Sequence, residues 1–213
     1  MKIKLITTVS NPNHEGLLKL KESLDRFEYD YEIIVNKDIK WEWGGLEDVY
    51  NWCKTQEGYT HFLYTDGFDT FAFSSMSEIE RKYKNTDKML FSTEKQCFPR
   101  KDWTDIHPQS ESEWKFLNHG QFISPIDTFL RLYEGVFQLN MTCQEWAMDL
   151  YLNGSEDIAL DLNCDVFQTI AFETEGDFEI REGRIFNLKN NSTPIFAHGN
   201  GRTDMTWIYN IDI

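Results

Sequence analysis

The chain has 213 residues, the size of one ordinary domain. Hydrophobic residues make up 40% of the sequence and charged residues 27%, so the chain can bury a core and is not a disordered tail. Its 21 Lys and Arg against 36 Asp and Glu give a net charge of −15, which weighs against a protein that grips nucleic acid through bulk positive charge.

The first half of the chain alternates between two kinds of pattern. Short β-branched and aromatic runs predict strands at 3–9, 31–35, 60–65 and 88–92. Apolar residues at intervals of three and four predict helices at 17–27 and 46–53, and Ser77 with Glu80 predicts a capping box that begins a third helix. This alternation predicts right-handed crossovers and an α/β fold with a mainly parallel, Rossmann-type sheet flanked by helices.

The second half is less regular. Residues 95–113 are polar, contain two prolines and show no period, so a long surface loop is predicted. Ser124-Pro125 predicts a helix start with Pro at the first helical position, and Thr142 with Glu145 predicts another start, for a helix that ends at 153–154. Further strands are predicted at 158–162, 166–172 and 194–197. No internal repeat or linker divides the chain, which indicates one domain.

The cysteines and the apolar runs bear on the cellular setting. The four cysteines form no C-x-x-C pair, so reduced thiols are expected. The first ten residues lack the apolar run of a signal peptide, and no stretch approaches the roughly 20 apolar residues of a membrane span. We therefore expect a cytoplasmic protein with no membrane partner.

The sharpest local motif follows the strand predicted at 60–65. Asp66 comes directly after that strand, and Asp69 lies three residues later, across a turn eased by Gly67. In open α/β sheets, ligands bind beyond the carboxyl ends of the strands, which is where this segment falls. Two neighbouring carboxylates repel each other unless a cation compensates them, so Asp66 and Asp69 are candidate metal ligands. An ordinary polar β-turn would show the same spacing.

A second predicted strand also runs into a glycine-rich turn, where His198 is followed by Gly199, Asn200, Gly201 and Arg202. The glycines let backbone N–H groups approach an anion closely, and Arg202 adds a fixed positive charge that suits a phosphate. His198 can complete a metal site with the two carboxylates, although a lone histidine near glycines is more often structural. An oxygen-rich site with one nitrogen suits Mn²⁺ or Mg²⁺ bridging a diphosphate better than tetrahedral zinc.

Several short motifs occur in the order in which one known family has them. They are Ile6-Thr7-Thr8-Val9, Trp43-Gly44-Gly45, Thr65 to Asp69, Leu90 to Glu94, Cys97-Phe98-Pro99, Phe116 to Ile123, Leu160-Asp161 with 166–168, and Pro194 to Gly201. Through these motifs the chain resembles, almost end to end, the glycosyltransferase domain of lysyl hydroxylases and collagen galactosyltransferases. The resemblance implies a single glycosyltransferase domain over residues 1–213, with a GT-A-like fold.

The resemblance also implies a UDP-sugar donor and a Mn²⁺ ion. The matched Asp66, Asp69 and His198 would hold the metal, which in turn holds the diphosphate. Further matched residues would lie around the nucleoside and the donor sugar: Thr8, Val9, Phe68, Asn118, Gly120 and Gln121. Phe68 stands where the family has a tyrosine that packs on the uracil. Gln121 stands where the family has a second glycine, which implies altered sugar recognition.

The chain departs from the family at two charged positions. Residues 141–143 replace a run of aspartates that precedes the glutamine matched by Gln144, so the usual acidic group is absent. The carboxylates that remain as candidates for a general base are Glu94, Asp149 and Asp161. Asp204 stands where the family has a lysine near the phosphates, and Arg202 can supply that charge instead.

The acceptor stays open at this point. The resemblance implies transfer of a hexose from a UDP-sugar to an acceptor hydroxyl on a hydroxylated side chain or a glycan, and Trp103 in the polar loop is a candidate acceptor contact. A hydroxymethylated DNA base in a viral setting is an alternative acceptor, against which the charge of −15 weighs. A non-catalytic nucleotide-sugar-binding module and a structural protein are further alternatives. The expected location is the cytoplasm of a bacterium or of a virus-infected cell.

Overall fold

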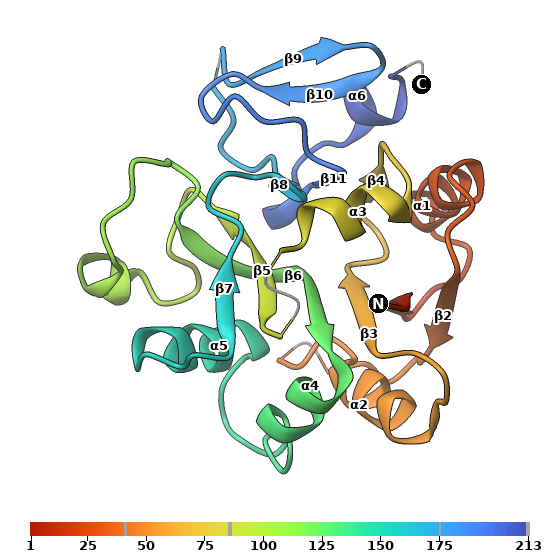
Figure 1. Cartoon of the computed structure of the whole chain (residues 1–213), viewed down its shortest axis with the longest axis vertical. Helices are drawn as coiled ribbons and strands as arrows, with labels where there is room; N and C mark the ends of the chain where they lie inside the picture. The colour runs from red at the N-terminus through yellow and green to blue at the C-terminus, as the bar shows by residue number, and fades with distance from the viewer. Residues whose placement is uncertain (41, 85–86, 175, 212–213) are drawn as a thin grey trace.

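A six-stranded sheet in the order β2-β1-β3-β6-β5-β7 forms the centre of the molecule (Figure 1). The structure is a computed structural model that describes residues 1–40, 42–84, 87–174 and 176–211. The strands are β1 (Ile3–Val9), β2 (Tyr31–Val35), β3 (His61–Thr65), β5 (Met89–Glu94), β6 (Phe116–Pro125) and β7 (Ile158–Leu160). Neighbours are parallel except at β6, which runs antiparallel to both β3 and β5. The predicted mainly parallel α/β sheet is therefore confirmed, with one reversed strand.

Helices cover both faces of this sheet. One face packs against α2 (Leu46–Thr55), α4 (Ile126–Leu132) and α5 (Cys143–Leu152). The other face packs against α1 (Glu15–Arg26) and α3 (Met76–Lys82). Successive residues of β1 point to opposite sides, because side chains alternate along a strand: Leu5 belongs to one core and Ile6 to the other.

A smaller, three-stranded sheet adjoins the core on the α1 side, in the order β4-β11-β8. Its strands are β4 (Thr70–Ala72), β8 (Phe167–Thr169) and β11 (Phe196–His198), with β11 parallel to β8 and antiparallel to β4. The hairpin of β9 (Phe178–Arg181) and β10 (Arg184–Asn187) and the short helix α6 (Thr206–Tyr209) enclose a third core at this end. Two 3₁₀ helices complete the fold, η1 (Lys101–Ile106) and η2 (Asn200–Arg202).

Helix starts show where local sequence signals were decisive. The predicted Thr142 and Glu145 capping box is present at the start of α5. The predicted Ser77 and Glu80 box is wrong, because the N-cap of α3 is Ser75, two residues earlier, and it forms no side-chain cap. Pro125 precedes α4 as its N-cap instead of occupying the first helical position.

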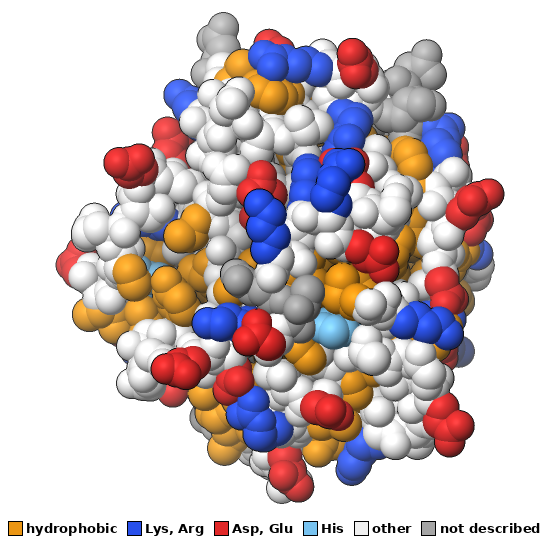
Figure 2. Space-filling model, in the orientation of Figure 1, with side chains coloured by type: hydrophobic (Ala, Val, Ile, Leu, Met, Phe, Trp, Pro, Cys, Tyr) orange, Lys and Arg blue, Asp and Glu red, His pale blue; other side chains and the backbone are white. Residues whose placement is uncertain are grey.

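The remaining predictions about surface and cysteines can also be compared with the structure. The four cysteines are free thiols, as expected. Among the described helices there is none with the length and apolar character that a bilayer crossing requires. On the face shown in Figure 2, acidic and basic side chains are interspersed.

Strand β6 contains an irregularity that positions the site. Phe91 on β5 pairs with Phe122, but the next residue, Ser92, pairs with Asn118, so residues 119–121 bulge away from β5. Bulges re-aim side chains and occur often beside active sites. Here the bulge brings the backbone of residue 120 to the end of β3, where its carbonyl accepts a hydrogen bond from the N–H of Asp66 at 2.8 Å.

Candidate active site

Asp66, Asp69 and His198 meet beside the carboxyl ends of β3 and β11. His198 Nε2 lies 3.4 Å from Asp66 Oδ2 and 3.5 Å from Asp69 Oδ1. One potential ligand atom from each residue lies within 4.8 Å of the other two. Ligand atoms that each sit about 2.0–2.6 Å from one ion are spaced in this way, so the three side chains can share a cation.

The His198 ring supports this assignment. Its side chain is 2% exposed, and neither ring nitrogen forms a hydrogen bond within the described part of the chain. A buried polar atom without a hydrogen bond costs roughly 1–3 kcal/mol. A metal ion bound at Nε2, the nitrogen that faces the two carboxylates, would remove this cost. The side chains of Asp66 and Asp69 are 45% and 31% exposed, so solvent reaches the group from the carboxylate side.

The electrostatics also favour a cation. Burial alone would lower the pKa of His198, but the carboxylates of Asp69 and Asp66 outweigh this effect and raise it. Burial raises the pKa of Asp69 to about 6; the charge of His198 opposes that shift and the charge of Asp66 adds to it. A bound divalent ion would relieve the repulsion between the two carboxylates.

Gly120 provides the space for this group. A Cβ atom at this position would lie 2.2 Å from His198 Cε1 and 2.8 Å from Asp66 Oδ2. Gly120 was predicted from the resemblance as a residue near the donor sugar, and the structure places it directly against two of the three ligand candidates, His198 and Asp66.

The residues predicted to line a nucleoside pocket lie at the ends of β1 and β3. Thr8 Oγ1 donates to the carbonyl of Gly44 at 2.8 Å, and Val9 is buried. Phe68 is half-buried, and its ring centroid lies 4.3 Å from that of His14. One face of the Phe68 ring is therefore occupied by a residue that the motifs did not indicate.

Glu94 is surrounded by side-chain amides. Its Oε1 accepts from Asn118 Nδ2 at 3.1 Å and from Gln144 Nε2 at 2.8 Å, and its Oε2 accepts from Asn200 Nδ2 at 2.9 Å. Burial raises the pKa of Glu94 to about 7, although these hydrogen bonds and the nearby His198 oppose the shift. Gln144 also accepts from the N–H of His119 in the bulge, at 3.1 Å, so the amides tie Glu94 to β6, α5 and the turn after β11.

The other two predicted bases lie in different surroundings. Asp161 is buried, and its oxygens accept backbone N–H groups of residues 165–167 at 2.8–2.9 Å, which holds the turn into β8. Burial raises the pKa of Asp161 to about 6, against the effect of these hydrogen bonds. Asp149 is half-buried in α5, five residues after Gln144 and therefore about 7–8 Å further along the helix axis.

Gln121 and the glycine-rich turn complete the predicted set. Gln121 is fully buried and donates to Thr65 Oγ1 at 3.1 Å, while its carbonyl oxygen has no partner among the described residues. The N–H of Gly199 donates to the carbonyl of Asp69 at 2.7 Å. Gly201 and Arg202 have φ angles of 69° and 64°, and the Arg202 side chain is exposed.

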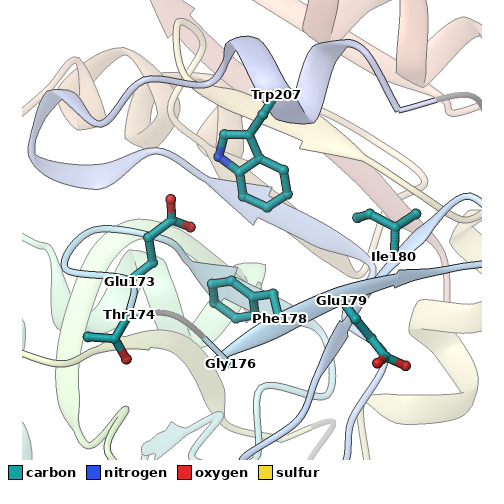
Figure 3. A pocket seen from close by; sticks show the side chains of 7 residues that line it. All are labelled: Glu173, Thr174, Gly176, Phe178, Glu179, Ile180 and Trp207. Carbon is teal, nitrogen blue, oxygen red and sulfur yellow. The ribbon is translucent and has the colours of Figure 1, made fainter.

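Two hollows open near the end of β8, and Thr174 lines both. One has a volume of about 420 Å³ and is lined by Phe178, Ile180 and Trp207 together with acidic residues (Figure 3). The other has a volume of about 550 Å³ and is lined by Phe172 and polar residues of the segment that connects β5 to β6. In that same segment the Arg100 guanidinium lies 4.3 Å from the centre of the Trp103 ring, the predicted acceptor contact, and covers one of its faces.

The mixed, mainly parallel sheet flanked by helices is the fold of GT-A glycosyltransferases, and solved structures share this fold. They include a glycosyltransferase involved in the glycosylation of the major capsid of PBCV-1 (TM-score 0.55, 11% identity, covering 94% of both chains). Mouse xyloside xylosyltransferase 1 also matches (TM-score 0.55, 10% identity, covering 95% of this chain and 98% of that one). The sequence pattern of one family, the PLOD GT domain, matches residues 2–210, and the chain belongs to this family.

Two relatives match most of this chain in sequence. Human multifunctional procollagen lysine hydroxylase and glycosyltransferase LH3 is 26% identical over 225 residues, which cover 96% of this chain and 30% of that protein. An uncharacterized protein of Acanthamoeba polyphaga mimivirus is 26% identical over 200 residues, which cover 88% of this chain and 43% of that protein. The matched region is thus less than half the length of each relative, and the predicted family resemblance is confirmed.

Proposed function

We propose that the chain is a metal-dependent glycosyltransferase that moves a hexose from a UDP-sugar to an acceptor hydroxyl. The observation that carries this proposal is the convergence of Asp66, Asp69 and the buried His198 within 4.8 Å. The group lies at the edge of the sheet where α/β proteins bind ligands. Family membership supports the class of reaction; the metal, the donor and the acceptor are our proposal.

The metal-ligating atoms of Asp66, Asp69 and His198 suit Mn²⁺ or Mg²⁺. Two carboxylates and one imidazole form an oxygen-rich set that matches these ions better than zinc, which favours sulfur and nitrogen. When bound, the ion would neutralise the diphosphate and stabilise the charge that grows on the leaving group. Asp66, Asp69 and His198 would hold the ion, and the exposed Arg202 would contribute a second positive charge for the phosphates.

The transfer itself exchanges one bond for another. The acceptor oxygen forms a bond to the anomeric carbon while the bond from that carbon to the diphosphate oxygen breaks. The nucleoside diphosphate leaves with the electron pair, and the acceptor hydroxyl must give its proton to a base. Negative charge therefore grows on the diphosphate, where the metal ion and Arg202 would stabilise it.

Of the three predicted carboxylates, Glu94 is the one we propose as the base. Its pKa of about 7 is close to a neutral working pH, which suits general-base assistance. Its Oε2 accepts one hydrogen bond, from Asn200, and so retains a free lone pair. Both oxygens of Asp161 are occupied by backbone N–H groups, which favours a structural role for that residue.

The proposal is tested by thermal shift and transfer assays with a panel of nucleotide sugars, with and without Mn²⁺ or Mg²⁺. A ligand that binds the folded state stabilises it, so the donor should raise Tm only when the metal is present. Asp66→Asn removes one charge with little change in shape and should abolish both effects. Asp127→Asn, an exposed carboxylate at the start of α4, serves as the control. Full metal-dependent transfer by Asp66→Asn would refute the metal assignment.

The same assays separate the alternatives. A non-catalytic nucleotide-sugar-binding module is the second candidate, motivated by the absence of acidic residues at 141–143. It predicts metal-dependent stabilisation by UDP-sugars with neither transfer nor slow hydrolysis of the donor. For the enzyme we propose an acceptor hydroxyl on a protein side chain or a glycan, since the charge of −15 disfavours a DNA acceptor.

A further inference from the structure

Phe172 has an unusual backbone and an unusual exposure. Its φ is 61°, in the left-handed region, and 55% of its surface is exposed. The left-handed conformation costs a non-glycine residue roughly 1–2 kcal/mol, and the ring belongs to none of the cores formed by the described residues. The fold itself therefore gains little from an aromatic side chain at this position.

The backbone just before Phe172 is tied to the proposed catalytic groups. The N–H of Ala171 donates to Asn200 Oδ1 at 3.0 Å. The amide of the same Asn200 donates to Glu94 at 2.9 Å. The N–H of Ile170 donates to the carbonyl of His198 at 3.0 Å. The segment that leads into Phe172 therefore belongs to the hydrogen-bond network around Glu94 and His198.

The hollow that Phe172 lines is otherwise polar. Its volume of about 550 Å³ lies within the range of roughly 300–1,000 Å³ found for small-molecule sites. The wall carries two lysines (Lys95 and Lys115), two glutamates (Glu111 and Glu113), three hydroxyl side chains and the Gln96 amide. Lys95 pairs with Glu113 at 3.0 Å and with the buried Asp177 at 2.6 Å, so opposite charges offset each other within the wall.

We infer that this hollow is the acceptor subsite and that Phe172 is the platform for a neutral sugar ring of a glycan acceptor. The aliphatic face of a hexose packs on an exposed aromatic ring, while paired charges, a hydroxyl and an amide donate to and accept from its hydroxyl groups. A wall with balanced charge favours a polyol over an ion. The inference rests on the proposed function and narrows its acceptor to a carbohydrate.

The other hollow has a different character. Phe178, Ile180 and Trp207 form its apolar part, and its charged lining residues, Glu173 and Glu179, are both acidic (Figure 3). A pocket with this lining favours a cationic group over a neutral sugar. It provides a direct control for the location of the acceptor.

Phe172→Gly tests the inference, because glycine removes the ring and suits the positive φ. Binding of the methyl glycosides of common hexoses is followed by saturation-transfer NMR, and acceptor KM is measured with those that the enzyme uses. We expect Phe172→Gly to raise the acceptor KM at least tenfold and to weaken glycoside binding equally, with Tm unchanged or higher. Phe172→Trp, which keeps an aromatic face, should retain binding.

Two comparisons make the outcome specific. Metal-dependent hydrolysis of the UDP-sugar without acceptor should be the same in wild type and Phe172→Gly; its absence from the wild type would count against the proposed function itself. Ile180→Ala changes an exposed apolar residue of the other hollow, 47% exposed, and should leave acceptor KM unchanged. An acceptor KM that does not respond to Phe172→Gly, or a wild type that binds none of the glycosides, would overturn the inference.

Discussion

Gly120 illustrates how the absence of a side chain can leave room for a proposed metal site. We predict that Gly120→Ala lowers Mn²⁺ affinity by tenfold or more, because its Cβ would stand 2.2 Å from His198 Cε1 and displace the ring. Titration calorimetry measures this effect. Gly135→Ala is the matched control: its Cβ would meet nothing within 4 Å, although φ there is +72°. The control should lose some stability and keep its Mn²⁺ affinity, and equal affinities in all three proteins would contradict the prediction.

Glu94 should make both the stability of the fold and kcat/KM depend on pH. Burial raises its pKa from an ordinary 4.5 to about 7, so between these pH values the folded protein holds a proton that the unfolded chain has released. Its contribution to stability is therefore greatest at low pH and declines as pH rises through this window. If the ionised form is the base, kcat/KM should fall about tenfold per pH unit below about 7.

The variant Glu94→Gln should be slower by roughly 10²–10⁴-fold, with a flat profile near neutral pH. It also loses at least one hydrogen bond, because the new amide nitrogen would face the amide of Asn200 in one orientation and those of both Asn118 and Gln144 in the other. The readout is kcat/KM against pH for both proteins. A wild-type profile without an inflection near pH 7 would exclude Glu94 as the base.

At this scale the sequence revealed the candidate metal ligands better than their surroundings. Asp66 directly follows the strand predicted at 60–65, and His198 directly follows the strand predicted at 194–197, so their place at the sheet edge could be predicted from local pattern. Asp69 lies three residues after Asp66, across the turn. The stacking of His14 on Phe68 could not, because it depends on how the start of α1 meets a loop more than fifty residues away in sequence. No local signal could show that Gln121 is buried against β3, because that depends on strand pairing.

At the scale of elements, one charged cluster joins α3 to the hairpin. Arg184 in β10 donates to both oxygens of Glu78, at 2.9 and 3.1 Å, and Lys82 pairs with the same carboxylate at 2.9 Å. Burial would raise the pKa of Glu78, but hydrogen bonds from Arg184, Ser74 and Lys82 lower it to about 2. The stability it contributes is present above the ordinary pKa of 4.5 and is lost as pH falls toward 2.

We therefore predict that Glu78→Gln lowers the free energy of unfolding by roughly 1–3 kcal/mol at pH 7, and by clearly less at pH 3. Urea unfolding at the two pH values measures this. Glu22→Gln removes the exposed pair with Lys19, whose side chains are 56% and 35% exposed, and should change stability by less than about 0.5 kcal/mol. Equal losses at both pH values would contradict the assigned role of the Glu78 charge.

The elements also show where pattern reading succeeds and fails. β1 and β2 have the predicted bounds, because each is a short run rich in β-branched residues with polar residues or turns at its ends. β6 was missed as a strand because its segment 118–121 is polar and bulged, so neither an apolar run nor strict alternation is visible. Residues 118, 119 and 121 form hydrogen bonds with Glu94, Tyr133, Gln144 and Thr65, and residue 120 leaves space for His198. These contacts need polar or small residues, which replace the usual strand pattern.

At the scale of the whole molecule, the net charge of −15 weighs against a DNA acceptor. A polyanionic duplex is repelled by such a surface, and acidic side chains lie among the basic ones on the face seen in Figure 2. We predict no binding to hydroxymethylated duplex DNA tighter than roughly 10⁻⁴ M at physiological salt, measured by fluorescence anisotropy. A strong affinity that falls steeply between about 50 and 200 mM salt would reinstate the DNA alternative.

The reversal of β6 has an architectural consequence. The chain leaves the sheet after Glu94 in β5 and returns at Phe116 in β6, which pairs with Glu94. The connecting segment therefore begins and ends at the sheet edge that holds Asp66. Insertions or deletions in this connecting segment would change the residues beside the proposed donor site, but they would leave the register of every strand in the sheet unchanged. Related proteins could therefore differ in their acceptor through the length of this one connecting segment.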